Sequence, residues 1–162
     1  MPKLSSHEKL ARLKRFQMTK KGHKQMLQKL EDLKKARPSA VKELARAREM
    51  GDLSENGLYT AAKARLNGID SNIFRIEMTL KLADVIEVED SGSVQIGSRV
   101  TVTDNNQEIV YEIVGDLEAN PKEQKVSPNS PIGKALIGKR KKENVQLHTP
   151  SGVKIITILE IS

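Results

Sequence analysis

Two carboxylates, Asp52 and Glu55, stand about one helical turn apart in a segment, residues 50–57, that has no other charged residue. Mg²⁺ prefers oxygen ligands and commonly takes only one or two carboxylates from a protein, so this pair has the chemistry of a partial magnesium site. Side chains three positions apart on a helix are neighbours, so both can face one ion. The same spacing fits a helix cap, with Asp52 as the cap and Glu55 at the third helical position. On these two residues alone, the cap is the commoner use.

The carboxylates follow a strongly basic segment of the chain. Residues 1–48 contain fifteen Lys and Arg and four acidic residues, a local charge of +11, whereas residues 49–56 have a local charge of −3. Residues 57–84 contribute +1 and residues 85–162 contribute −2, which completes the net charge of +7. Basic residues on a helix usually form a solvated face. An acidic point at the end of a basic segment favours a functional role for the carboxylates.

The composition argues against several other kinds of site. The chain has no Cys and its three His are scattered, so neither a disulfide framework nor a zinc site is expected. Its aromatic residues are two Tyr and two Phe, so contacts with nucleic acid would be electrostatic rather than stacked. No apolar run approaches the roughly 20 residues that span a bilayer, and the N-terminus lacks the apolar stretch of a signal peptide. We therefore expect a cytoplasmic protein with no membrane partner.

Apolar residues on both sides of the acidic segment predict two long helices. After it, they recur in steps of four and three, as in the seam of a coiled coil, at Ala62, Leu66, Ile69, Ile73, Ile76, Leu80 and Ala83. Before it, the stripe is less regular, with Leu27, Leu30, Leu33, Ala40 or Val41, Leu44 and Ala47. Pro38 predicts a kink or a break in the first helix, and Gly51 can end that helix. The two helices predict an antiparallel hairpin with the carboxylates at its tip.

The residue pattern changes after Asp84 to one that predicts a sheet. Stretches rich in β-branched residues predict strands at residues 85–88, 99–103, 108–114, 145–148 and 153–159, with turns at 104–106 and 149–152. A short helix is expected from Pro131 to Ile137, with Ser130 as its N-cap and Gly138 after its end. The fold class is therefore α+β. Residues 1–17 are an N-terminal extension, 18–84 the coiled-coil hairpin, and 85–162 a small, mainly antiparallel sheet domain.

One continuous motif surrounds the acidic tip. It consists of Ala47-Arg48-Glu49-Met50-Gly51-Asp52-Leu53-Ser54-Glu55-Asn56 and then Tyr59-Thr60-Ala61-Ala62-Lys63. Met18-Thr19, Gly22 and Arg37-Pro38 precede it, and Asn129-Ser130-Pro131-Ile132-Gly133-Lys134-Ala135-Leu136-Ile137-Gly138-Lys139 and Thr149-Pro150-Ser151-Gly152 follow it. These motifs, in this order over residues 18–162, resemble the Gre family of bacterial transcript-cleavage factors, and most closely its A-type. Residues 1–17 precede the family's usual start, and Arg140-Lys141-Lys142 is more basic than in many A-type members.

The resemblance implies a coiled-coil hairpin followed by an FKBP-like domain, and a monomer that is not itself an enzyme. Such a factor binds RNA polymerase and inserts its hairpin through the secondary channel. There it stimulates the polymerase to cleave backtracked nascent RNA, which restores elongation from arrested complexes. Asp52 and Glu55 would be the catalytic residues, and would hold Mg²⁺ jointly with the polymerase rather than on the free protein. One would ligate the ion and the other would orient the attacking water, in either assignment.

Residues away from the two carboxylates also have expected roles, and the resemblance implies the one given to the loop at residues 129–131. Arg48, Lys63 and Arg65 flank the tip and are expected to contact RNA phosphates or the channel walls, although solvated helix faces would account for them equally well. Asn129, Ser130 and Pro131 are expected to dock on the rim of the channel, and the same triplet also makes a helix cap. Arg37 is expected to be a structural salt-bridge partner. Tyr59 is expected either to stack on RNA or to pack under the turn, and packing is slightly favoured.

Four other functions fit the sequence less well. A non-catalytic homologue that occupies the channel and inhibits the polymerase would share the fold, but the intact Asp52 and Glu55 argue against it. A free-standing nuclease would need a fuller acidic cluster or a His site. Prolyl isomerase activity would need an apolar aromatic pocket, and residues 85–162 contain only Tyr111 as an aromatic residue. Generic DNA binding would explain the basic segment but not the acidic tip.

Overall fold

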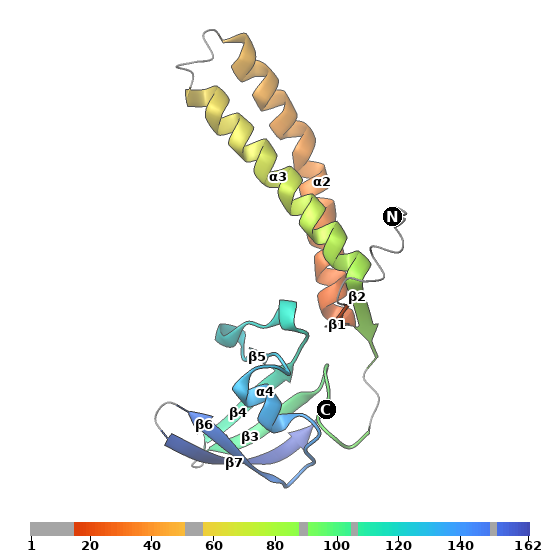
Figure 1. Cartoon of the computed structure of the whole chain (residues 1–162), viewed down its shortest axis with the longest axis vertical. Helices are drawn as coiled ribbons and strands as arrows, with labels where there is room; N and C mark the ends of the chain where they lie inside the picture. Colours follow the sequence, from red (N-terminus) through yellow and green to blue (C-terminus); the bar gives the residue numbers. More distant parts are fainter. Residues whose placement is uncertain (1–14, 51–56, 88–90, 105–106, 150–151) are drawn as a thin grey trace, which may run out of the picture. The chain divides into compact units, whose positions relative to one another are not determined.

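The chain divides into two compact units. The computed structural model describes residues 15–50, 57–87, 91–104, 107–149 and 152–162 (Figure 1). The described residues up to His23 and Ala83–Ser162 form the first unit, and Lys24–Leu82 forms the second. Asp52 and Glu55 lie outside the described residues, as does Gly51. In the described part of the chain, no helix is both long and apolar enough to cross a membrane.

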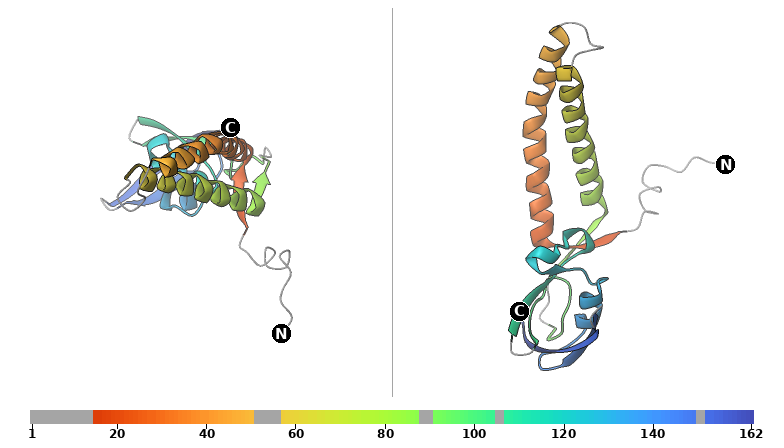
Figure 2. Two further views of the ribbon diagram at one scale, coloured as in Figure 1. Left: turned by 90° about the horizontal axis from the view of Figure 1, so that it is seen from above. Right: turned by 90° about the vertical axis from the view of Figure 1, so that its left-hand side faces the viewer.

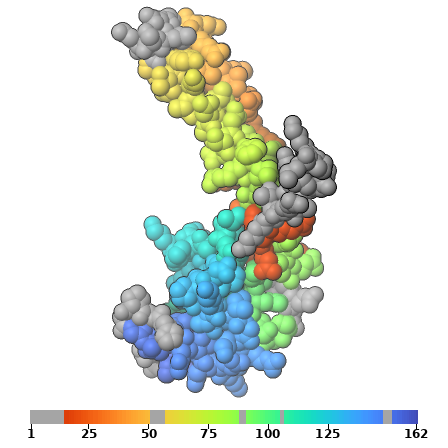
Figure 3. Space-filling model, viewed as in Figure 1, coloured from red at the N-terminus to blue at the C-terminus, as the bar shows by residue number. Residues whose placement is uncertain are grey.

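The second unit consists of two helices that run side by side in opposite directions (Figures 1 and 2). Helix α2 is Lys20–Glu49 and helix α3 is Gly57–Leu82, which confirms the predicted hairpin. The seam of α3 has the predicted spacing: Ile76 is buried, and the half-buried members are Ala62, Leu66, Ile69, Ile73 and Leu80. The prediction is wrong for Ala83, because α3 ends at Leu82 and Ala83 begins strand β2 (Ala83–Ile86). The described part of this unit contains no third helix, so much of the outer surface of α3 remains open (Figure 3).

The seam of α2 is more regular than the sequence suggested. Ala40 and Ala47 are buried, and the half-buried members are Met26, Leu30, Leu33 and Leu44. Leu27, which the sequence analysis placed in the stripe, is 43% exposed, so that assignment is wrong and Met26 takes its place. A break at Pro38 is also wrong, because α2 is one continuous helix of 30 residues. A proline removes one backbone hydrogen bond, and the packing of a long helix on its partner offsets that loss.

A short parallel ribbon belongs to the first unit. Strand β1, Phe16–Thr19, pairs with strand β2, Ala83–Ile86, in the register Phe16 to Ala83 through Thr19 to Ile86. Met18 of β1 is fully buried. The sequence analysis missed β1, because four residues are too few for an alternating pattern and two of them were assigned to the N-terminal extension. Strand β2 begins two residues before the predicted strand.

The rest of the first unit is a five-stranded sheet with the order β5-β4-β3-β7-β6. The strands are β3 (Arg99–Asp104), β4 (Gln107–Ile113), β5 (Lys125–Val126), β6 (Asn144–Thr149) and β7 (Gly152–Ile161). All neighbours are antiparallel except β4 and β5, which confirms the mainly antiparallel prediction. The predicted turn at 149–152 is consistent with the pairing of Thr149 with Gly152.

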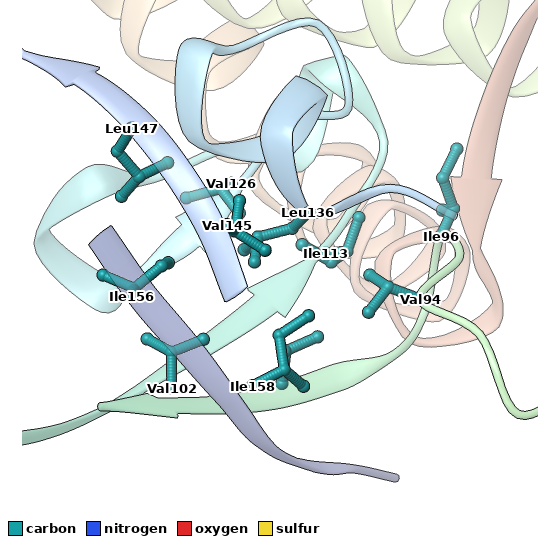
Figure 4. Close-up of a cluster of buried hydrophobic side chains, with 11 residues drawn as sticks. Val94, Ile96, Val102, Ile113, Val126, Leu136, Val145, Leu147, Ile156 and Ile158 are labelled. Carbon is teal, nitrogen blue, oxygen red and sulfur yellow. The ribbon is translucent and has the colours of Figure 1, made fainter. Parts of the chain in front are cut away.

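Helix α4, Pro131–Leu136, closes the core of this domain (Figure 4). Its Leu136 is fully buried among strand residues that include Val102, Ile113 and Ile158. As predicted, Ser130 caps the helix, since its Oγ accepts a hydrogen bond from Gly133 N at 3.0 Å. A Cβ at Gly133 would stand 1.9 Å from the Ser127 carbonyl oxygen, so only glycine lets the first turn pack this closely on the preceding loop.

The first turn of α2 is held by a carboxylate from a distant part of the same unit. Glu118 ends a short 3-10 helix, η1 (Asp116–Glu118). Its carboxylate accepts hydrogen bonds from Thr19 N at 2.7 Å and Thr19 Oγ1 at 2.5 Å, while Thr19 Oγ1 accepts from Gly22 N at 2.9 Å. A negative charge at a helix N-terminus also complements the helix dipole. Glu118 therefore determines where α2 begins.

Replacing Glu118 with Ala should destabilise the protein by about 1–3 kcal/mol, because two part-buried donors of Thr19 lose their acceptor. Urea unfolding of the full chain measures this change. The matched control is Glu123→Ala in the 3-10 helix η2, Pro121–Glu123, whose carboxylate pairs with Lys125 at the surface and should matter little. Equal unfolding midpoints for the two variants would show that Glu118 does not hold the start of α2.

Candidate functional site

The acidic segment connects the two ends of the hairpin. Helix α2 ends at Glu49 and helix α3 begins at Gly57, so the predicted catalytic pair, Asp52 and Glu55, belongs to the connection and lies outside the described residues. The structure describes the helix ends on either side of it. These ends carry the basic residues that the sequence analysis selected.

Arg48 and Lys63 meet at the same aromatic ring beside the connection. The Arg48 guanidinium carbon, from α2, lies 5.8 Å from the centroid of the Tyr59 ring, and the Lys63 ammonium, from α3, lies 5.9 Å from it. Cations over an aromatic ring at exposed sites are stabilised by about 0.5–1 kcal/mol. The structure therefore brings two of the three predicted phosphate-binding residues together from opposite helices. Tyr59 is half-buried, in line with its expected packing role.

Arg65, the third predicted basic residue, has a different environment. Its Nη1 donates to both carboxylate oxygens of Glu43 on α2, at 2.8 and 2.6 Å. An ion pair offsets much of the positive charge of Arg65, so this residue is less available to a phosphate than Arg48 or Lys63. The sequence analysis did not identify Glu43 as its partner, because the register between the two helices is not readable from either helix alone.

An apolar groove separates the two helices next to their connection. It has a volume of about 380 Å³ and is lined by Glu43, Arg46, Ala47, Met50, Leu58, Ala61, Ala62 and Arg65. Three of the lining residues are alanines, whose small side chains leave space between the helices. The two large apolar lining residues are mostly exposed, Met50 at 70% and Leu58 at 62%. The sequence analysis did not predict this groove, because Ala47 and Ala62 were interpreted only as seam positions of the two helices.

The predicted docking loop is organised by one carboxylate, Asp116. Asn129 Nδ2 donates to both oxygens of Asp116, at 3.0 and 2.8 Å, and the Ser127 hydroxyl donates to one of them. The backbone N of Asn129 donates to Ser127 Oγ at 3.0 Å. The Ser130 hydroxyl is used as the cap of α4, so Asn129 and Pro131 are the exposed members of the predicted triplet.

A second groove of about 340 Å³ lies beside this loop, within the first unit. It is lined by Arg15, Phe16, Gln17, Asp84, Ile96, Gly115, Asp116, Pro128 and Asn129. An ion pair crosses its wall, with Arg15 Nη1 at 3.0 Å from Asp84 Oδ1. The docking loop therefore borders a polar recess with both signs of charge. The sequence analysis missed Asp116 and this recess, because their residues come from five separate stretches of the chain.

The described residues contain no group of three or more His, Cys, Asp or Glu side chains that could hold a metal ion. The expected magnesium site depends on Asp52 and Glu55, which are not among the described residues. Their donor chemistry fits Mg²⁺, since both are carboxylates. Two carboxylates leave most of an octahedral shell to other ligands, so the pair is suited to an ion shared with a second macromolecule.

Comparisons with known proteins agree with this arrangement. The family described as transcription elongation factor, N-terminal, matches residues 16–85, and the family described as transcription elongation factor GreA/GreB, C-terminal, matches residues 89–162. The transcription elongation factor GreA of Vibrio cholerae is 42% identical over 151 residues, which cover 90% of this chain and 96% of that protein. The GreA of Macrococcus caseolyticus is 43% identical over 154 residues, which cover 92% and 98%.

A solved structure also matches the chain. The crystal structure of GreA factor homolog 1 (Gfh1) of Thermus thermophilus is 30% identical, and the match covers 92% of this chain and 99% of that one with a TM-score of 0.44.

Proposed function

The chain belongs to the GreA/GreB family of transcription elongation factors, and on this premise we propose that it stimulates RNA polymerase to cleave backtracked nascent RNA. RNA polymerase is its partner, and the chain is a cofactor of that enzyme rather than an enzyme itself. One observation supports the proposal above the others. The acidic signature connects the two helices of an antiparallel hairpin, and two cations gathered on Tyr59 stand next to it.

The tip carboxylates complete a metal site in the polymerase. When bound, Mg²⁺ stabilises negative charge on the phosphate and lowers the pKa of the attacking water. Of Asp52 and Glu55, one binds the ion and the other accepts a hydrogen bond from the water, which orients it toward the phosphate. Because the pair binds Mg²⁺ weakly alone, the factor depends on the polymerase for its effect, and the free protein does not cleave RNA.

The basic residues beside the tip act on binding rather than on the reaction. Arg48 and Lys63, which lie over Tyr59, attract the phosphates of the nascent RNA, whereas the ion pair with Glu43 offsets part of the charge of Arg65. In the first unit, Asn129 and Pro131 dock on the rim of the channel, and the neighbouring recess receives side chains of the polymerase. The factor acts as a monomer, in the cytoplasm where the polymerase is.

Removing the tip charges should abolish most cleavage and leave polymerase binding intact. We expect Asp52→Asn and Glu55→Gln each to lower the rate at least about 100-fold, because a metal ligand or a water-orienting base is lost while shape is kept. RNA release from a backtracked elongation complex measures the rate. Glu49→Gln, at the last residue of α2, removes a charge outside the pair and is the control. Wild-type rates for both tip variants would eliminate the mechanism, and cleavage of naked RNA by the free protein would indicate a nuclease.

A charge placed on the docking loop should weaken polymerase binding. Pro131→Glu suits this test, because an acidic residue in the first turn of α4 favours the helix, whereas Ser130→Glu would remove its cap. We expect the variant to bind at least about tenfold more weakly, equivalent to roughly 1.4 kcal/mol. Pro121→Glu is the matched control, since Pro121 also opens an exposed helix, η2. Equal affinities of the two variants in a pull-down titration would place docking elsewhere.

Neutralising Arg48, Lys63 and Arg65 together should raise the factor concentration needed for half-maximal cleavage, with little change in the saturated rate. Attraction to phosphates weakens steeply with salt, so the salt dependence of that concentration should flatten in the same variant. Among single changes to Gln, Arg65→Gln should have the smallest effect, because Glu43 already pairs with it. A titration in which the saturated rate collapses at an unchanged half-maximal concentration would instead place these residues in the reaction.

A further inference from the structure

The seam of the hairpin does not by itself fix how the two helices align. Both seams repeat every seven residues, so a slide of one heptad would replace one aliphatic contact with another. Burial is also slight, because Ala40, Ala47 and Ile76 are the only buried residues among the described part of the second unit. A shallow, repeating seam specifies register weakly. Interactions other than the apolar seam must therefore favour the observed alignment over the alignments that are shifted by one heptad.

Three ion pairs join the helices at successive levels. Lys34 Nζ lies 2.7 Å from Glu77 Oε1, Arg37 Nε 2.7 Å from Asp70 Oδ1, and Arg65 Nη1 2.6 Å from Glu43 Oε2. The pair of Arg37 and Asp70 makes two contacts, the second between Nη2 and Oδ2 at 3.3 Å. Asp70 raises the pKa of the Arg37 guanidinium, first through this hydrogen bonding and then through its charge.

Arg37 differs from the other partners in its position along the helix. Met26, Leu30, Leu33, Ala40, Leu44 and Ala47 follow one another in steps of four and three, and Arg37 fills the gap between Leu33 and Ala40. It is therefore a charged residue at a seam position, directly in line with Leu30 and Leu44 one heptad away. A single polar residue at such a position costs stability and selects one alignment over others. Lys34, in contrast, lies beside the seam.

We propose that the Arg37–Asp70 pair sets the register of the hairpin and so positions the acidic connection. The positioning role rests on the function proposed above. A slide of one heptad in either direction takes Arg37 away from Asp70 and places Leu30 or Leu44 opposite that carboxylate. In one direction, Arg37 comes opposite Lys63, which repels it. In the other, Arg37 comes opposite Glu77, and Lys34 loses the partner that it has in the observed alignment. A fork-shaped guanidinium with two contacts resists such a slide better than a point charge does.

The register matters because the hairpin turn moves with it. In the observed alignment the turn is centred between Met50 and Gly57, the residues that bound the acidic segment. A one-heptad slide, about 10 Å along the axis, would centre it on Met50 or on Gly57 instead. Met50 and Leu58, which both line the groove beside the connection, would then no longer face each other. Arg37 and Asp70 are thus positioning residues that act through the two carboxylates.

Disulfide trapping tests the register directly, because the chain has no Cys of its own. Ala47→Cys with Ala61→Cys reports the observed alignment, since both residues line the groove between the helices. Ala47→Cys with Gly68→Cys and Ala40→Cys with Ala61→Cys report the two slides, because each moves one partner by a heptad. A disulfide forms only when two Cβ atoms approach to about 4 Å, so the relative rates at which the three Cys pairs are trapped under mild oxidation distinguish the three alignments.

With Arg37 and Asp70 intact, we expect disulfide formation in the first Cys pair and little in the other two. Arg37→Leu or Asp70→Leu should raise trapping of a slid pair at least about fivefold, although circular dichroism shows the helices retained. The reversed pair, Arg37→Asp with Asp70→Arg, should restore selective trapping. Lys34→Leu is the control, as it breaks an ion pair beside the seam and should leave the pattern unchanged. Trapping of the first pair alone in both leucine variants would overturn the proposal, as would an equal shift in the control.

A cleavage assay then separates the register from the proposed function. Saturated cleavage should fall in Arg37→Leu at unchanged polymerase binding and recover in the reversed pair. If the wild-type factor caused no cleavage, the proposed function would fail, while the trapping result on the free protein would still decide the register. Slid alignments with full cleavage would overturn the positioning role.

Discussion

A hairpin of two helices has a single seam, so the second unit can bury apolar side chains along only one face of each helix. A globular domain covers each helix on several sides, whereas here α2 and α3 have only each other within the described residues of their unit. Little apolar surface can therefore be buried, and small residues such as Ala40 and Ala47 take the closest positions. Exposed ion pairs between the helices add little to stability. Each pair forms in only some alignments, so together they can favour one alignment where the apolar contacts barely differ.

In the first unit, carboxylates fix the positions of a loop and of the start of a helix. The short helix η1 carries Asp116 at one end, which holds Ser127 and Asn129, and Glu118 at the other, which holds Thr19. The docking loop and the start of α2 are thus fixed by two carboxylates of one three-residue element. A displacement of the loop by a bound partner would act on the residues next to Glu118, so the anchor of α2 and the loop share a common support.

Periodicity and local chemistry made part of this structure predictable. The four-three spacing of α3 and the Ser130 cap are local signals, and the structure confirms both. Strands β1 and β5 were missed because they are too short to alternate. Glu118 and Asp116 were missed because their partners are distant: 99 residues separate Thr19 from Glu118, and 13 separate Asp116 from Asn129. Such contacts depend on topology, which no single segment encodes.

The three basic residues beside the connection, Arg48, Lys63 and Arg65, differ in their immediate partners, and this difference affects how strongly each can attract a phosphate. A cation paired with a carboxylate loses most of its field, so Arg65 beside Glu43 stabilises the hairpin at the expense of long-range attraction. An aromatic face attracts a cation but carries no net charge to cancel that of the cation, and Arg48 and Lys63 both lie over the ring of Tyr59. One tyrosine thus orders two cations, one from each helix end, without the loss of field that a carboxylate partner would cause.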